Sequence, residues 1–479
     1  MILPSSPVPD VPHAPATRVA VIGGGASGVL TAINLLTTPG GEHVAVTIHE
    51  AGGIVGRGVA YGTSDPRHLL NVRARHMSAW PDVPSDLLEW AARTGRDVDP
   101  QGFLPRRDYA VYLQDTLASV ADHRLTVRAG RVDDIVARDG GGYDVHAAGT
   151  VSVADSVVLA YGNQLPRSLV VDGDVLPAAP WLVADPWDLA SLHLLPGDAT
   201  AVVVGTGLTA IDTVITLLEE HPSRRVVMVS RHGLLPETHV GQQSTAWVSP
   251  TITGPLTAAA LAAFFDEQVA AAEQQGVDWR AVVDGLRSQT QAVWQLLDLD
   301  ERRSFLSEHA RHWEVRRHRM APRVAVRLEG YRAEGRLAVL SGGIHRVIDR
   351  GDRCEVHVGR GHPPVTADML VNCTGPSTDI SRSGDPLLLA LRERGLASPD
   401  PLCLGLSTTT DGVLLDPHGQ PVAGMYAVGP PRKGILWEST AIPEIRTQAA
   451  EVARAQVAWA SGLAAGRKPH GERAAVAER

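Results

Sequence analysis

The chain has 479 residues with 44 Lys and Arg against 53 Asp and Glu, which gives a net charge of −9 at pH 7 and argues against a dedicated nucleic-acid binder. The length suits two or three domains, and 44% apolar with 20% charged residues is ordinary for a globular protein. No apolar run approaches the roughly 18 residues that a membrane span needs. Residues 1–17 are Pro-rich and lack the pattern of a secretory signal, so we interpret them as a disordered leader and expect a cytoplasmic protein.

The first motif is a glycine loop between a strand and a helix. Residues 18–22 read as a buried parallel strand, and the GxGxxG pattern follows directly, before an apolar helix. The next strand, residues 43–50, ends in an acid that is placed to accept hydrogen bonds from ribose hydroxyls. We therefore expect a dinucleotide site formed by Gly23, Gly25, Ser27, Gly28 and Glu50.

The same pattern returns in the middle of the chain. Residues 201–204 read as a strand, GxGxxA follows with Gly205, Gly207 and Ala210, and the next strand ends in Ser230 and Arg231. No acid stands at this tip, where it would repel a 2′-phosphate, and Arg suits a phosphate through its planar fork. We therefore expect NADPH at this loop; the alternative for Arg231 is a solvated surface arginine.

A longer repeat surrounds both loops. Residues 124–132 resemble residues 336–344, and residues 154–162 resemble residues 367–375, so that each half contains a short antiparallel meander and an apolar strand that ends at a glycine. The predicted fold is α/β, with two Rossmann-like dinucleotide-binding domains, antiparallel meanders and a helical insertion at about 256–332. This is the layout of flavoproteins in which one nucleotide is FAD and the other NAD(P)H.

The C-terminal part completes this plan. A strand ends at Gly429, and a helix follows from Pro443 to about residue 460, with its N-terminus expected to face the flavin. We expect Gly375 and Gly429 to approach the cofactors. The predicted domains are the first part of the FAD-binding domain at 18–195, the NADPH-binding domain with its insertion at 196–335, the second part of the FAD-binding domain at 336–462, and a flexible tail at 463–479.

Several blocks carry a resemblance to a known family. They are Gly58-Val-Ala-Tyr61-Gly-Thr-Ser-Asp65-Pro66-Arg-His68-Leu-Leu-Asn71-Val with Met77-Ser78, Arg231-His-Gly-Leu-Leu-Pro236, Arg317-His318-Arg319-Met320-Ala-Pro322, and Trp437-Glu438 through Pro443-Glu444-Ile-Arg446. Over residues 18–460 the chain resembles the FAD/NAD(P)-binding proteins of the group-B flavin monooxygenase superfamily. Within it the chain resembles the L-aspartate N-monooxygenases that form nitrosuccinate and, more distantly, a FAD-dependent urate hydroxylase.

Two positions depart from the family pattern. Tyr161 stands where the first strand-glycine motif usually has Thr, and Pro430 stands where many such flavoproteins have an Asp that binds the ribitol of FAD. A side-chain contact to ribitol is therefore not expected from Pro430, although the backbone of Gly429 could serve.

The choice of electron acceptor follows from what the sequence lacks. A disulfide acceptor needs a cysteine pair, but Cys354, Cys373 and Cys403 are far apart, and no histidine has the spacing of a metal ligand set. Dioxygen is the simplest remaining acceptor. The resemblance then implies a flavin C4a-hydroperoxide that passes oxygen to a nucleophile, here an amine nitrogen.

Residues outside the glycine loops are candidates for substrate contacts. Asn71 lies where the resemblance places the chain beside the flavin, and a turn-capping Asn is the alternative. Arg57 is expected to bind the FAD phosphates. The cluster formed by Arg316, Arg317 and Arg319 could hold a dicarboxylate or the NADPH phosphates, the alternative being ion pairs with Asp298, Asp300 and Glu301.

Three functions are compatible with these residues. The first is an FAD- and NADPH-dependent N-hydroxylating monooxygenase of a small amino acid, with L-aspartate and nitrosuccinate as the specific expectation, in secondary metabolism such as antibiotic biosynthesis. The second is a carbon hydroxylase of an electron-rich ring such as urate, against which the 4% aromatic content counts weakly. The third is an NADPH-flavin reductase without oxygen transfer. The expected partners are the amino acid and dioxygen, with a homo-oligomer left open.

Overall fold

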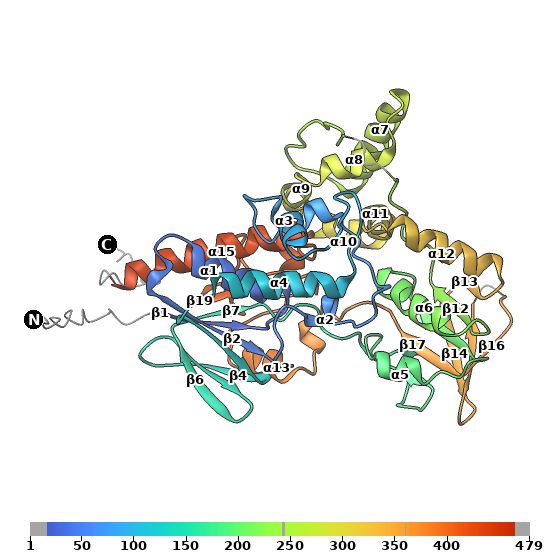
Figure 1. The fold of residues 1–479 in the computed structure, drawn as a ribbon, viewed down its shortest axis with the longest axis horizontal. Helices are drawn as coiled ribbons and strands as arrows, with labels where there is room; N and C mark the ends of the chain where they lie inside the picture. Colours follow the sequence, from blue (N-terminus) through green and yellow to red (C-terminus); the bar gives the residue numbers. More distant parts are fainter. Residues whose placement is uncertain (1–16, 242–244, 360, 465–479) are drawn as a thin grey trace, which may run out of the picture.

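Two sheet-based units lie side by side, and a group of helices covers their junction (Figure 1). The computed structural model describes residues 17–241, 245–359 and 361–464. The expected leader lies outside these residues except for Thr17, which begins the first strand, and so does the expected tail beyond residue 464. Within the described ranges no helix is long and apolar enough to cross a membrane.

The first unit is built on a six-stranded sheet in the order β18-β19-β7-β1-β2-β3. All neighbours are parallel except β18, which runs antiparallel to β19. The strands are β1 (Thr17–Ile22), β2 (Val44–Glu50), β3 (Leu125–Ala129), β7 (Ser156–Leu159), β18 (Val413–Leu415) and β19 (Pro421–Ala427). The chain thus returns to this sheet at its C-terminal end, as the sequence predicted.

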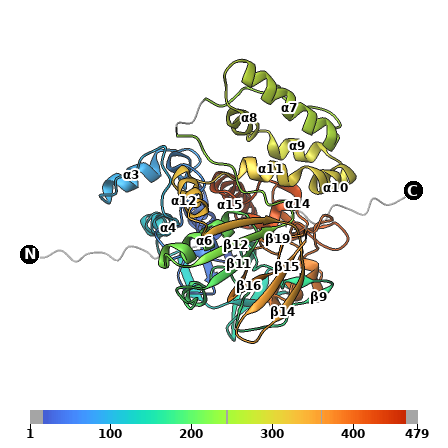
Figure 2. The same ribbon diagram turned by 90° about the vertical axis from the view of Figure 1, so that its right-hand side faces the viewer.

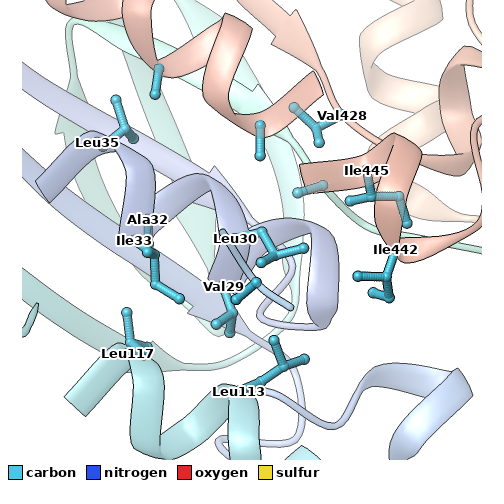
Figure 3. Packing of buried hydrophobic residues seen from close by; sticks show 14 of the residues in the cluster. Val29, Leu30, Ala32, Ile33, Leu35, Leu113, Leu117, Val428, Ile442 and Ile445 are labelled. Carbon is cyan, nitrogen blue, oxygen red and sulfur yellow. The ribbon is translucent and has the colours of Figure 1, made fainter. Parts of the chain in front are cut away.

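Helix α1 (Ala26–Thr37) lies at the centre of the first core. It packs between α4 (Arg106–Val120) and the C-terminal helix α15 (Ile442–Ala464). Figure 3 shows Val29, Leu30 and Ile33 of α1 among side chains of both neighbouring helices, and all three are fully buried. Because α1 is apolar on nearly all sides, it is stable only when covered on all of them, which ties the end of the chain to its beginning.

The second unit has a five-stranded sheet in the order β10-β17-β11-β12-β13, with all pairs parallel. Its strands are β10 (Leu182–Val183), β11 (Thr200–Val204), β12 (Arg225–Ser230), β13 (Leu337–Ser341) and β17 (Met369–Asn372). Helices α6 (Leu208–Glu220) and α12 (Pro322–Ala333) contribute to its apolar core, and the short α5 (Leu189–His193) precedes β11.

The two units repeat each other down to single hydrogen bonds. The Asp155 carboxylate accepts from the backbone N–H of Arg18 at 2.8 Å, and the Asp368 carboxylate accepts from that of Thr200 at 2.9 Å. Each aspartate follows a three-stranded antiparallel meander, and the elements are β4 (Val132–Ala137), β5 (Tyr143–Ala147), β6 (Thr150–Ala154), β14 (Ile344–Asp349), β15 (Cys354–Val358) and β16 (Val365–Ala367). The predicted α/β fold with two repeated dinucleotide-binding units is confirmed.

One predicted domain boundary is wrong. The sequence placed the return to the first unit at residue 336, but β13 pairs with β12 and β17 pairs with β11, so residues 337–372 belong to the second unit. The strand β10 also pairs with β17, which extends the second unit to residues before the predicted start at 196. The physical reason is that the meander belongs to each repeat, so the second repeat ends only after its own β17.

Each unit carries an accessory segment at the same place in the repeat. In the first unit residues 51–105 lie between β2 and α4, and they contain α2 (Gly58–Tyr61) and α3 (Asp86–Arg93). In the second unit the insertion lies between β12 and α12. Its helices are α7 (Ala258–Gln274), α8 (Trp279–Leu286), α9 (Thr290–Leu296), α10 (Leu299–Glu308) and α11 (Ala310–Arg317), with α7 and α8 farthest from the sheets (Figures 1 and 2). The remaining elements are β8 (Val170–Val171), β9 (Asp174–Val175), α13 (Pro386–Glu393) and α14 (Lys433–Leu436).

Candidate functional site

The first glycine loop has the geometry that its motif predicts. Gly23 has φ +103°, and a Cβ there would lie 2.6 Å from the carbonyl oxygen of Ala160. A Cβ on Gly28 would lie 1.8 Å from the carbonyl oxygen of Gly23, so only glycine lets α1 approach the strand this closely. A Cβ on Gly25 would meet only Gly58, whose Cα would lie 3.4 Å away. The loop is therefore little covered at the N-terminus of α1, where N–H groups and the helix dipole favour phosphate.

Glu50 closes this loop from the tip of β2. Its Oε2 accepts a hydrogen bond from the N–H of Gly24 at 2.7 Å, and its Oε1 accepts one from the N–H of Gly52 at 3.0 Å. A carboxylate has about four lone-pair sites, so two remain for the hydroxyls of a ribose. Glu50 is thus held in place while it keeps acceptor capacity.

A cavity of about 1060 Å³ runs from this loop along the end of the first sheet. This volume is slightly above the usual range of about 300–1,000 Å³ for ligand pockets, which leaves room for a ligand as large as a dinucleotide. Ser27, Arg57 and Tyr61 line it, with Arg57 exposed. Tyr161, Pro430, Thr440 and Ile445 line it as well, so the first turn of α15 reaches this cavity, and the residues present fit FAD.

Gly429 and Gly375 lie at the ends of β19 and β17. The N–H of Gly429 already donates to Oε1 of Gln448 at 2.9 Å, and a Cβ on Gly429 would lie 2.4 Å from Oγ of Ser27. Gly429 therefore allows the close approach of β19 to α1, and its amide is engaged within the protein. Gly375 has φ +98° with open space around it, and a cofactor contact for it stays a prediction.

The second glycine loop repeats the first. Gly205 has φ +124°, and a Cβ there would lie 2.1 Å from the carbonyl oxygen of Cys373. Gly207 has no atom within 4 Å of its Cβ position, so the loop is open at the start of α6. Ala210 is fully buried beneath the loop. This arrangement leaves room for a second pyrophosphate.

The tip of β12 carries hydroxyls and cations. Ser230 Oγ accepts from the N–H of Gly233 at 3.0 Å and lies 2.9 Å from Oγ1 of Thr206, in the glycine loop. Arg231 is exposed and directly follows Ser230. A hydroxyl and an arginine at this tip suit a 2′-phosphate better than a ribose diol.

The predicted basic cluster divides between a half-buried residue and two buried ones. Arg317 is 7% exposed, with its Nη2 3.2 Å from Oε2 of Glu438 and 3.5 Å from Oε1 of Glu444. Arg319 is 3% exposed and pairs with Asp284. Arg316 is half-buried, and its guanidinium lies 5.4 Å from the ring centre of Phe265. The acids that pair with Arg317 and Arg319 are thus not the Asp298, Asp300 and Glu301 that the sequence suggested.

These ion pairs form one buried network at the start of α15. Arg287 donates to both oxygens of Glu444, at 2.6 and 2.8 Å. Burial alone would raise the pKa of Glu438, but the nearby Arg317 and His318 hold it below its ordinary value. The Nε atoms of Arg317 and Arg319 are buried with no hydrogen-bond partner among the described residues. These Nε donors are therefore not used by other described residues of the chain.

Asn71 contacts His239, a histidine on which the charge of Arg319 acts. Its carbonyl oxygen accepts from Nε2 of His239 at 3.0 Å, so Nε2 carries the ring proton. Burial, with the positive charge of Arg319, lowers the pKa of His239 to about 4. Asn71 does not line the large cavity, and its predicted contact with flavin or substrate stays a prediction.

His68 has a role in the structure that the sequence motifs did not indicate. Nδ1 of His68 lies 2.8 Å from Oγ1 of Thr63, and Nε2 lies 2.8 Å from Oγ1 of Thr216 and 3.0 Å from the carbonyl oxygen of Asp212, both on α6. Burial lowers the pKa of His68, although the charges of Asp212 and Asp65 act in the opposite direction. This block of the first unit therefore binds the second unit. The only available signal was a His in an otherwise apolar stretch.

A family model described as FAD-NAD(P)-binding matches residues 20–164. The large cavity and the first glycine loop lie mainly in this segment. No curated protein matches the sequence. The three solved structures described next resemble the chain at low identity, and they therefore report on the fold.

The ornithine N-hydroxylase of Kutzneria sp. 744, solved with reduced FAD, NADP⁺ and L-ornithine, matches with a TM-score of 0.62 at 15% identity, over 93% of this chain and 99% of that chain. The chain has the fold of a two-dinucleotide flavoprotein. L-lysine 6-monooxygenase from Pseudomonas syringae matches this flavoprotein fold with a TM-score of 0.57 at 16% identity, over 93% of this chain and 99% of that chain. The FAD-bound cadaverine monooxygenase from Erwinia amylovora matches with a TM-score of 0.59 at 13% identity, over 91% of this chain and 93% of that chain.

Proposed function

We propose that the protein is an FAD- and NADPH-dependent monooxygenase that hydroxylates the amine nitrogen of a small amino acid. The observation that carries the proposal is the difference between the two equivalent strand tips. Glu50 offers a carboxylate to a ribose diol, whereas Ser230 and Arg231 offer a hydroxyl and a cation to a 2′-phosphate. One chain would thus hold FAD and NADPH in separate sites. The three solved structures reported above are of enzymes whose names state action on ornithine, lysine or cadaverine, all of them amines.

The residues of the large cavity would bind and orient FAD. The N-terminus of α1 and Glu50 would hold the pyrophosphate and the ribose, and the first turn of α15 would favour negative charge beside it. Bound FAD supplies electron transfer from NADPH to dioxygen. The protein's part is to position both nucleotides and to keep water away from the junction of the two units.

The cysteines support dioxygen rather than a disulfide as the acceptor. All three are free. Burial raises the pKa of Cys373 to about 12 and that of Cys354 to about 12, so both stay protonated at neutral pH. A protonated buried thiol is a poor nucleophile. A reductase that passes electrons to a protein disulfide is therefore disfavoured.

L-Aspartate, oxidised to nitrosuccinate, is the specific substrate that we propose, with Arg317 and Arg319 binding its carboxylates. Both arginines are paired with acids, so a substrate carboxylate would use the unpartnered Nε donors or displace an acid. The substrate amine must lose its proton before it can accept oxygen. An unperturbed α-amino group has a pKa of about 8, so turnover should rise between about pH 6 and pH 8.

The test measures NADPH oxidation and oxygen uptake with L-aspartate, L-ornithine, L-lysine and urate, and identifies each product by mass. An N-oxidised product from any amine supports the proposal. A hydroxylated urate would establish a carbon hydroxylase instead. Hydrogen peroxide alone with every compound would leave a plain NADPH oxidase and overturn the proposal.

A further inference from the structure

Arg311, the second residue of α11, reaches out of the helical insertion to the second glycine loop. Its Nη2 donates to Oγ1 of Thr206 at 3.1 Å and to the carbonyl oxygen of Leu234 at 2.6 Å. Thr206 in turn lies 2.9 Å from Ser230, the residue before Arg231. The guanidinium of Arg311 is therefore separated from the tip of β12 by a single hydroxyl group.

One acid and one further arginine act on Arg311. Burial lowers its pKa, the negative charge of Glu314 raises it, and the positive charge of Arg231 lowers it again. The acid on the same helix, Glu314, has its Oε1 3.6 Å from Nζ of Lys433. In the part of the chain that the structure describes, no carboxylate lies within ion-pair distance of Arg311 or Arg231. Arg311, linked to Ser230 through Thr206, and Arg231, which follows Ser230, thus place two arginines without a paired acid near the tip of β12, which suits an anion with two charges.

We propose that Arg311 and Arg231 together hold the 2′-phosphate of NADPH, with Arg311 contributed by the insertion. The proposal rests on the assignment of NADPH to the second loop. Arg231 is exposed, whereas Arg311 is held by its hydrogen bonds to Thr206 and Leu234. Arg311 thus gives the site its rigidity, since a preordered arginine loses little freedom when it binds phosphate.

The proposal gives the insertion a role in coenzyme choice. The helix that carries Arg311 ends in Arg317, which pairs with Glu438 and Glu444 at the start of α15. A phosphate bound at one end of α11 would therefore stabilise the position of the residues at its other end. Coenzyme binding and the arrangement of the buried network would then depend on one helix.

The test compares 2′,5′-ADP with 5′-AMP, which differ only by the 2′-phosphate, by titration calorimetry on the FAD-loaded protein. The wild type should bind 2′,5′-ADP at least tenfold more tightly, because charge-assisted hydrogen bonds to phosphate are among the strong ones. Arg311→Ala should lose about tenfold for 2′,5′-ADP and keep its affinity for 5′-AMP. Arg311→Lys should lie between the two. Arg303→Ala, which removes an exposed arginine on α10, should bind like the wild type.

The outcomes distinguish the assignment of NADPH to the second loop from the role of Arg311. Equal binding of both nucleotides by the wild type would overturn the assignment of NADPH and the proposal with it. Wild-type discrimination that survives in both Arg311 variants would overturn only the role of Arg311. Equal loss for both nucleotides in both Arg311 variants would assign Arg311 to loop structure and also overturn the proposal.

Discussion

The carbonyl oxygens of Glu50 and Ser230 accept equivalent hydrogen bonds, from the N–H of Gly130 at 3.0 Å and from that of Gly342 at 2.9 Å. The two residues thus occupy the same place in the two repeats, at the end of β2 and of β12. Because their backbones make the same hydrogen bond, the two residues differ in their side chains, and we propose that this difference selects the nucleotide. Under the proposed function, this pair is the point at which the two repeated units would differ in the nucleotide that they bind.

Two glycines of the first loop should respond differently to substitution. Gly25 has φ −69°, which any residue can adopt, and its Cβ position has only Gly58 nearby, so Gly25→Val should fold. The valine side chain would fill the space of the pyrophosphate, and the purified protein should be colourless. Gly28→Ala would place its Cβ 1.8 Å from an oxygen and should yield little folded protein. Absorbance at the flavin bands and far-UV circular dichroism distinguish the two results; full FAD content in Gly25→Val would contradict the assignment.

Arg231→Ala should weaken the binding of NADPH and leave the binding of NADH nearly unchanged. Losing a charge-assisted hydrogen bond costs about 1.5–3 kcal/mol, which corresponds to about tenfold or more in KM for NADPH. Steady-state kinetics with both coenzymes measure the effect, and Arg225→Ala, an exposed residue at the start of β12, serves as the control. An equal change for NADPH and NADH would show that Arg231 acts on the loop structure.

Neighbouring arginines of α11 should differ in their effect on stability. Arg317→Ala would leave Glu438 without its arginine partner, and breaking a buried ion pair in this way costs about 3–5 kcal/mol. Arg316→Ala removes only a cation over Phe265, worth about 0.5–1 kcal/mol. Urea unfolding of both variants tests this. Should Arg317→Ala prove as stable as Arg316→Ala, the pair with Glu438 would not be an important contact, and a substrate role for Arg317 would gain weight.

The protein should lose stability as the pH falls from 6.5 toward 4. The pKa of His239 is about 4 in the folded chain against 6.5 as its ordinary value, so between these values the unfolded chain binds more protons. Each unit of pKa shift corresponds to about 1.4 kcal/mol. His239→Gln keeps a donor for the carbonyl of Asn71 but does not titrate, so its midpoint of thermal unfolding should depend less on pH. The exposed His43→Gln is the control, and the same slope in both variants would contradict the prediction.

Local pattern was sufficient to predict the loops, the repeat and the place of the insertion. Gly23 and Gly205 were found because strand, turn and helix follow each other within about 20 residues. The boundary at residue 336 was wrong because the partner of β13 is β12, more than 100 residues earlier, and nothing local distinguishes the two sheets. The partners of Arg317 could not be predicted for the same reason, since Glu438 and Glu444 lie more than 100 residues later in the sequence. Arg311 belongs to no sequence motif, so its contact with the second glycine loop could not be predicted from the sequence.

The accessory segments at matching places in the two repeats hold the opposite units. His68, from the segment after β2, binds α6 of the second unit, while Arg287, in the insertion after β12, binds Glu444 of the first. Each unit therefore contributes an accessory segment that binds the other unit. Opening the junction would break both sets of buried polar contacts together. The two nucleotide-binding units should therefore melt as one cooperative body, and neither should be recoverable as a stable fragment.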